Sequence, residues 1–132
     1  MTEAYTTLDL PLTDEVVRSL HCGDPVRLNG VIVTARDRAH QWLFERFIRQ
    51  SITPNPEDLQ VYDALKPYLA NSLIYHCGPI VEQLENGGYH FIAAGPTTSA
   101  REEVYEAEIM DHFNLKGMIG KGGMGPRTLQ AC

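Results

Sequence analysis

Three short stretches of the sequence place a cationic side chain beside glycine or hydroxyl residues. They are TARDRAH (34–40), GPTTSAR (95–101) and GKGG (120–123). An arginine guanidinium can hold a carboxylate through two parallel hydrogen bonds, and a lysine adds a further positive charge. Arg36, Arg101 and Lys121 therefore predict a binding site for a small dicarboxylate.

Each stretch also has a simpler explanation. Thr97, Thr98 and Ser99 can serve only to cap a helix, since Ser99 and Glu102 have the spacing of a capping box. Arg101 would then be an ordinary solvated charge.

The other two stretches have their own alternatives. His40 can be a surface or core histidine without a chemical role. The loop at 120–125 resembles a nucleotide-binding loop, but Gly122 stands where a P-loop needs serine or threonine. A non-catalytic module that binds an anion or a nucleotide therefore remains the alternative from another functional class.

The three stretches lie where predicted strands end. Residues 26–35 form one predicted strand with Gly30 as a bulge, and residues 89–94 and 115–119 form two others. A helix is predicted over 36–50 with Asp37 as its N-cap, and another after Ser99. Ligands bind beyond the carboxyl ends of strands in open α/β sheets, so the stretches should converge.

The remaining segments complete an α/β pattern. Residues 51–71 are predicted to form a connection with a helical stretch, 72–77 a strand, and 81–88 a loop. Pro126 begins a predicted helix of about one turn, which suggests a chain shortened at its C-terminal end. Together the elements predict one α/β domain over 1–132, with helices packed on a central sheet.

Composition excludes several functional classes. The 132 residues carry a formal net charge of −6, which argues against general binding to nucleic acids or acidic membranes. No apolar run approaches the ~20 residues of a membrane span, and the acidic N-terminus lacks the features of a signal peptide, so we expect a cytoplasmic protein. The cysteines at 22, 77 and 132 form no CxxC pair, which predicts no metal ligands on this chain.

Taken together, the sequence motifs resemble those of a known protein family. TARDRAH, IYHCGP, AAGPTTSAR and GMIGKGGMG, in this order, are similar to the β subunit, or C-terminal domain, of class I iron–sulfur-dependent fumarases and L-tartrate dehydratases. The resemblance covers about residues 23–128. It implies a swivelling β/β/α domain that closes over a [4Fe–4S] cluster held by three cysteines of an α subunit. The activity implied is the reversible hydration of fumarate to malate.

The resemblance also implies roles for individual residues. Arg36, Arg101 and Lys121 would hold the substrate carboxylates, and Thr97 would move the proton at the reacting carbon. The residues that would support the site are Asp37, His40 and Thr98.

Several alternatives stay open within the family. The sequence does not separate fumarate from tartrate or a methylated analogue. Family members continue beyond the GKGG loop, so a remnant without activity is a further alternative. Activity is expected only with the α subunit, and self-association of the isolated chain is expected from its exposed closing face.

Overall fold

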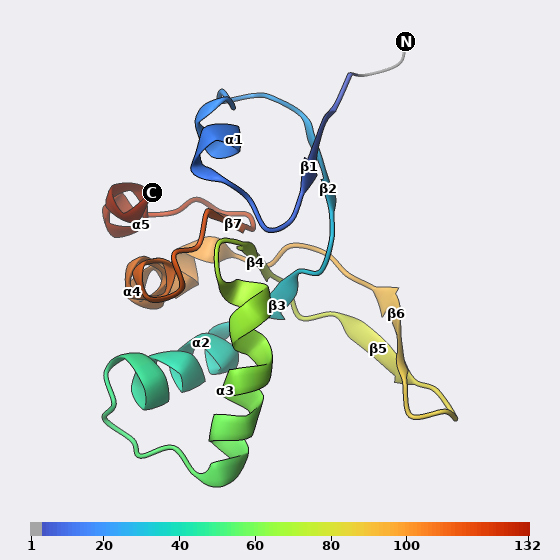
Figure 1. The fold of residues 1–132 in the computed structure, drawn as a ribbon, viewed down its shortest axis with the longest axis vertical. Helices are drawn as coiled ribbons and strands as arrows, with labels where there is room; N and C mark the ends of the chain where they lie inside the picture. The colour runs from blue at the N-terminus through green and yellow to red at the C-terminus, as the bar shows by residue number, and fades with distance from the viewer. Residues whose placement is uncertain (1–3) are drawn as a thin grey trace.

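The computed structural model describes residues 4–132 as a mixed α/β protein (Figure 1). The predicted α/β class is confirmed, but the strands form three small sheets and not one central sheet. The strands are β1 (Thr6–Asp9), β2 (Val26–Asn29), β3 (Val33–Ala35), β4 (Leu73–His76), β5 (Ile80–Gln83), β6 (Tyr89–Ala93) and β7 (Gly117–Ile119). The helices are α1 (Asp14–Arg18), α2 (Asp37–Leu43), α3 (Pro56–Leu69), α4 (Glu103–Phe113) and α5 (Pro126–Ala131), with a π-helical turn at Phe44–Ile48 and a 3₁₀ turn at Ser99–Glu102.

The middle of the molecule is a parallel sheet in the order β3-β4-β7. Val33 pairs with Ile74, and Ile74 pairs with Met118. Successive strand residues face opposite sides of a sheet. Accordingly Ile74 packs in the main core with α2, α3 and α4, whereas Leu73 packs in a second core with β1, β2 and α1. Both faces of this sheet are therefore covered.

The predicted strand over 26–35 is wrong in one respect, because it is divided at Gly30. Gly30 has a φ of 121°, which is unfavourable for other residues, and a Cβ there would lie 3.0 Å from the Leu10 side chain. The part before Gly30 is β2, which pairs with β1. The part after it is β3, which ends at the first predicted cationic stretch.

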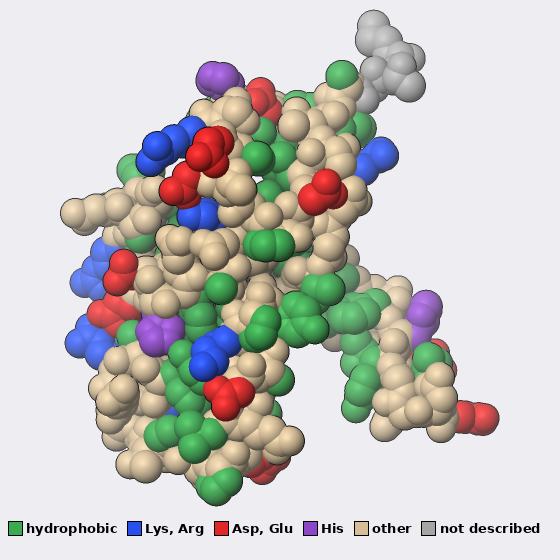
Figure 2. Space-filling model, in the orientation of Figure 1, with side chains coloured by type: hydrophobic (Ala, Val, Ile, Leu, Met, Phe, Trp, Pro, Cys, Tyr) green, Lys and Arg blue, Asp and Glu red, His purple; other side chains and the backbone are tan. Residues whose placement is uncertain are grey.

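The prediction of a loop over residues 81–88 is wrong for the first part of that segment, which belongs to a strand. Ile80–Gln83 forms β5, which pairs in an antiparallel hairpin with β6. The hairpin extends away from the rest of the molecule, with apolar side chains on its surface (Figures 1 and 2). The large exposed apolar residues of the hairpin are Ile80, Val81, Leu84, Tyr89, Phe91 and Ile92.

Two helices differ in detail from the prediction. The helix predicted over 36–50 begins as α2 at Asp37, with Arg36 as its N-cap, so Asp37 is not the cap residue. The connection at 51–71 contains a full helix of 14 residues, α3, which begins with a reciprocal capping box between Asn55 and Asp58. Asp58 also accepts hydrogen bonds from Trp42 and Arg46, which join α3 to the preceding helical segment.

None of the helices in residues 4–132 has both the length and the apolar character needed to cross a membrane.

Candidate functional site

The carboxyl end of β4 is the point at which two of the predicted stretches meet. The Thr97 amide donates to the carbonyl of His76 at 2.7 Å, and the Lys121 amide donates to the carbonyl of Thr97 at 3.1 Å. The Ser99 amide donates in turn to the Lys121 carbonyl at 2.6 Å. Thr98 and Lys121 form an isolated parallel bridge. The GPTTSAR and GKGG stretches therefore lie against each other, as predicted.

Gly120 allows this close approach. A Cβ at this position would overlap the Ser99 hydroxyl and would lie 3.0 Å from Nδ1 of His76. Any other residue would push the 120–123 loop away from β4. The glycine before Lys121 is therefore a steric requirement of the site.

The third stretch lies at the neighbouring strand end. Arg36 follows β3, and its side chain lies over Gly78, where a Cβ would come 2.6 Å from Cδ and 2.8 Å from Nη1 of the arginine. This end of the sheet contains a pocket of about 500 Å³. Its lining includes Thr34, Arg36, Asp37, Arg38, Cys77 and Gly78.

The predicted cations differ in their immediate partners. Nη2 of Arg101 donates to Oγ1 of Thr97 at 3.5 Å, one helical turn earlier in the sequence. Arg101 and Arg36 both lower the pKa of Asp37 through their positive charges. Lys121 is exposed beside Thr97 and Thr98. The three predicted cations are therefore gathered around the ends of β3, β4 and β7.

Two carboxyl groups near the arginines, those of Asp37 and Glu102, have pKa values shifted in opposite directions. The hydrogen bond from Glu102, followed by the charges of Arg101 and Arg36, lowers the pKa of Asp37 below its ordinary value. Burial raises the pKa of Glu102 to about 8, and Asp37 adds to this rise. Asp37 is therefore the stronger acid of the two, and Glu102 the weaker.

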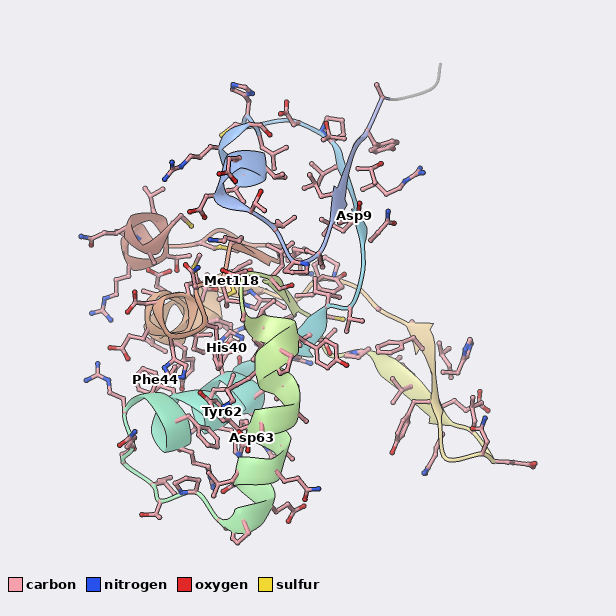
Figure 3. All side chains as sticks on the ribbon, in the orientation of Figure 1. Asp9, His40, Phe44, Tyr62, Asp63 and Met118 are labelled. Carbon is pink, nitrogen blue, oxygen red and sulfur yellow. The ribbon has the colours of Figure 1, made fainter. Side chains whose placement is uncertain are left out.

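His40 lies inside the molecule and not in the pocket. The side chain of His40, on α2, is fully buried, and its ring centre lies 5.1 Å from that of His76 (Figure 3). Neither ring nitrogen of His40 has a hydrogen-bond partner among residues 4–132, and Nδ1 lies 3.8 Å from Oε2 of Glu102. Burial lowers the pKa of His40 to about 4, so the ring is neutral at pH 7. This position suits a supporting residue that contacts no ligand.

The predicted capping box of Ser99 and Glu102 is wrong. The 3₁₀ turn begins after Thr98 without a side-chain cap, and the Ser99 hydroxyl instead lies 2.8 Å from Nδ1 of His76. Glu102 points into the interior toward His40. The local spacing of the motif is that of a cap, but Ser99 is buried against Gly120 and Glu102 is buried beside His40, so neither side chain caps the turn.

Sequence reasoning missed two contributors to the site. The spacing of two residues predicts that Arg38 points away from Arg36, but both arginines line the same pocket. Glu103, at the start of α4, accepts hydrogen bonds from the amides of Gly125, Arg127 and Thr128. It therefore fixes the far end of the loop that carries Lys121, and no local pattern indicates this contact.

Metal-ligating residues are not gathered in the described chain. Within residues 4–132, no three side chains among His, Cys, Asp and Glu are placed to hold a metal ion. Cys77 is buried at the end of β4, while Cys22 and Cys132 are exposed elsewhere. Within residues 4–132 the three cysteines are therefore not placed together as an iron–sulfur cluster, which needs several thiolates, would require.

The chain is similar to known proteins of one family. The family model described as "Fumarase C-terminus" matches residues 2–132. A Geobacillus stearothermophilus protein named "Putative fumarate hydratase class I" is 44% identical over 125 residues, which are 95% of this chain and 21% of that protein. The L(+)-tartrate dehydratase subunit beta of Escherichia coli K12 is 36% identical over 126 residues, which are 95% of this chain and 54% of that subunit. The chain thus spans about half, or less, of these relatives.

The family match covers nearly the whole chain, and the same stretches that meet at the ends of β3, β4 and β7 lie within it. The chain therefore belongs to the fumarase C-terminus family.

Proposed function

We propose that this chain is the β-type part of a hydro-lyase that adds water reversibly to fumarate. One observation supports this proposal above the others. Two loops that carry Thr97, Arg101 and Lys121 are hydrogen-bonded to each other and to the end of β4, beside the pocket that holds Arg36. A chain with a formal net charge of −6 thus gathers cations at one sheet edge. Such local clustering suits a small dianion.

In this proposal the cations bind the substrate and Thr97 transfers the proton. Arg36 and Arg101 hold carboxylates through paired N–H groups, and Lys121 contributes a point charge. The hydroxyl of Thr97 lies within reach of the Arg101 guanidinium at 3.5 Å. A nearby positive charge stabilises the alkoxide form of a hydroxyl, which a threonine needs to act as a base.

The positive charge of Arg101 at the beginning of a helical segment also has a role in this proposal. The amino end of a helix is already partly positive, so an arginine there is unfavourable without a counter-charge. A bound dianion would supply that counter-charge. In this proposal Asp37, Thr98 and His40 are supporting residues that help to hold the site in shape.

The cofactor in this proposal belongs to a partner. The [4Fe–4S] cluster would be held by an α subunit, and it would supply the open iron at which substrate binds. This chain would contribute the cations and Thr97 as a swivelling domain that closes over that subunit. The beta-subunit name of the Escherichia coli relative supports such a division between two chains.

Fumarate is the first choice of substrate, and tartrate is the second. The relative named for fumarate hydration is 44% identical to this chain, while the relative named for tartrate dehydration is 36% identical. Both substrates are four-carbon dicarboxylates, which the same cations would bind.

The test is to purify this chain together with an α subunit of the same family under anaerobic conditions. Conversion of malate and of a methylated analogue is then followed by the absorbance of the unsaturated product, and conversion of tartrate by the oxaloacetate that forms. The proposal expects turnover of malate by the pair and none by this chain alone. Turnover by this chain alone, or binding of ATP with no response to any dicarboxylate, would contradict it.

A further inference from the structure

Two glutamates of α4 contact the same hydroxyl group of α5, the helix that lies beside α4 (Figure 1). The hydroxyl oxygen of Thr128 lies 2.7 Å from Oε2 of Glu103 and 2.5 Å from Oε2 of Glu106. Thr128 is 1% exposed and Glu106 is fully buried. Bulk water therefore does not reach the contact between the Glu106 carboxyl and the hydroxyl.

The chemistry of this contact requires an additional proton. A threonine hydroxyl carries one hydrogen, and an ionised carboxylate only accepts hydrogen bonds. Two ionised carboxylates would have to share that single hydrogen, and two negative charges would lie on either side of one oxygen inside the protein. One of the two glutamates must therefore carry a proton, which it donates to the oxygen of Thr128.

Glu103 has the surroundings of an ionised carboxylate. Its Oε2 accepts from the amide of Gly125 at 2.7 Å, and its Oε1 accepts from the amides of Arg127 and Thr128 at 2.9 and 3.2 Å. The hydrogen bonds from the Thr128 side chain and from these amides lower the pKa of Glu103. Glu103 is therefore the acceptor for the hydrogen of the Thr128 hydroxyl.

Glu106 has the opposite surroundings. Its Oε1 has no hydrogen-bond partner among the described residues, and Nε2 of His76, on β4, lies 3.6 Å away. Burial lowers the pKa of His76, which favours a neutral ring, and the ring of His40, on α2, packs against it. The other charged groups near Glu106 are Glu102 and Glu103, both acidic. Burial, with the charge of Glu103 added to it, raises the pKa of Glu106, so the proton belongs to Glu106.

The contact continues into the loop that carries Lys121. Glu103 binds the amide of Gly125 at the end of this loop, and a Cβ at Gly125 would lie 2.6 Å from Cδ of Glu103. We propose that Glu106 is a neutral acid at pH 7 that acts, through Thr128 and Glu103, as a positioning residue for the loop of Lys121. This inference rests on the proposed function only for the role of Lys121 in binding the substrate.

The first measurement locates the proton. The full chain is labelled uniformly with ¹³C and ¹⁵N, and the carboxyl carbons of Glu103 and Glu106 are assigned by NMR through their bonds to the backbone, without any variant. At pH 7 the Glu106 carbon should have the chemical shift of a carboxylic acid, and the Glu103 carbon that of a carboxylate. A carboxylate shift for Glu106 at pH 7 would overturn the inference.

The second measurement follows the loop by amide hydrogen exchange at pH 7. The amide of Lys121 donates to the carbonyl of Thr97 at 3.1 Å and reports on the loop. The amide of Lys116 donates to the carbonyl of Ser72 at 2.8 Å, at the opposite end of β4 and β7, and serves as the reference. Local opening of the loop speeds exchange at Lys121 alone, whereas a general loss of stability speeds exchange at both amides.

Three variants test the hydroxyl and the acid. Thr128→Val keeps the shape of the side chain without its hydroxyl, so exchange at Lys121 should become about fivefold faster or more, with Lys116 unchanged. Thr128→Ser restores the hydroxyl and should exchange like wild type. Glu106→Gln is neutral and keeps an N–H donor for the Thr128 oxygen, so its exchange at Lys121 should stay within about twofold of wild type.

Two results would overturn the positioning role: unchanged exchange of Lys121 in Thr128→Val, or equal acceleration of Lys121 and Lys116. Unprotected exchange of Lys121 in the wild-type chain would do the same. Neither measurement uses a substrate or a partner subunit. If the reconstituted pair failed to convert malate, the proposed function would be wrong, while an acid signal from Glu106 and a loop that responds to Thr128→Val would still establish the contact.

Discussion

The hydroxyl of Ser99 and the Nδ1 atom of His76 lie 2.8 Å apart in the interior, directly beneath the loop that carries Lys121. Both residues also use their backbones at the same place. The carbonyl of His76 accepts from Thr97, and the amide of Ser99 donates to the carbonyl of Lys121. One buried pair therefore connects the end of β4 with both loops of the candidate site.

Removal of this hydroxyl should destabilise the protein. Ser99→Ala leaves a buried histidine nitrogen without a partner, which costs about 1–3 kcal/mol of unfolding free energy. Ser72→Ala is the matched control, because the Ser72 hydroxyl is buried and has no partner among the described residues. Urea unfolding at pH 7 measures both. Equal stability of the two variants would show that the Ser99–His76 contact is unimportant.

The packing of Arg36 over Gly78 predicts a binding defect from a single methyl group. Gly78→Ala places a Cβ within 2.8 Å of the guanidinium and displaces it from the pocket. The KM for the dicarboxylate should rise about tenfold or more, because a charge-assisted contact is lost. Gly95→Ala is the control, since a Cβ there meets no atom within 4 Å. Unchanged KM in Gly78→Ala would remove Arg36 from the binding site.

Substitutions of the proposed site residues should differ in their kinetics. Thr97→Ala keeps every charge, so binding should persist while kcat falls about 100-fold or more, as for the loss of a general acid–base group. Arg101→Ala should lose about 2–4 kcal/mol of transition-state binding, and Lys121→Ala a similar amount.

The control for these charges is Lys66→Ala, which removes an exposed lysine of α3 that pairs with Asp63. Steady-state kinetics of the reconstituted pair would measure all four variants. If Arg101→Ala and Lys66→Ala were equally active, the dicarboxylate clamp would be wrong.

The hydrogen bonds of the Glu103 carboxylate predict that the free energy of unfolding depends on pH. Hydrogen bonds from the Thr128 side chain and from the amides of Gly125, Thr128 and Arg127 lower its pKa below the ordinary 4.5. A lowered folded-state pKa contributes stability above pH 4.5 that is lost as the pH falls through the folded value. Glu103→Gln should therefore be less stable than wild type at pH 7, and the difference should shrink below pH 4.5. Thermal unfolding at pH 7 and pH 3.5 compares them.

The apolar surface of the β5–β6 hairpin predicts self-association of the isolated chain. Phe91 is 56% exposed and is paired with Val81, which is also exposed. Contiguous exposed apolar surface drives association in water. Phe91→Lys should lower the apparent mass in light scattering at high concentration, whereas Leu129→Lys, at an exposed apolar residue of α5, should not. A wild-type chain that stays monomeric would contradict the prediction.

Local signals in the sequence predicted most elements and the gathering of the cationic stretches. Pro126 predicted the start of α5, because proline is favoured in the first turn of a helix. The ends of the predicted strands placed the loops of Thr97 and Lys121 side by side, and their backbones are hydrogen-bonded. These features depend on short-range preferences or on the general rule for strand ends in α/β sheets.

The features that sequence reasoning missed depend on distant partners. Ile80–Gln83 becomes a strand only because β6 pairs with it, and the close approach of Leu10 leaves no room for a side chain at position 30. Glu102 has the spacing of a capping residue, yet it is buried beside His40, and this burial raises its pKa. Tertiary packing overrides local preference at such positions.

The parallel pairing of β3, β4 and β7 also has a consequence for how the chain folds. The paired residues Val33, Ile74 and Met118 are each separated by about 40 residues of sequence, so each pairing must first close a long loop. Lys121 reaches Thr97 only when the last of these loops has closed, since it follows β7 directly. A partly folded chain with β3 and β4 already paired would hold Arg36 in place and still lack Lys121. The proposed anion site should thus be completed late in folding, together with the docking of β7.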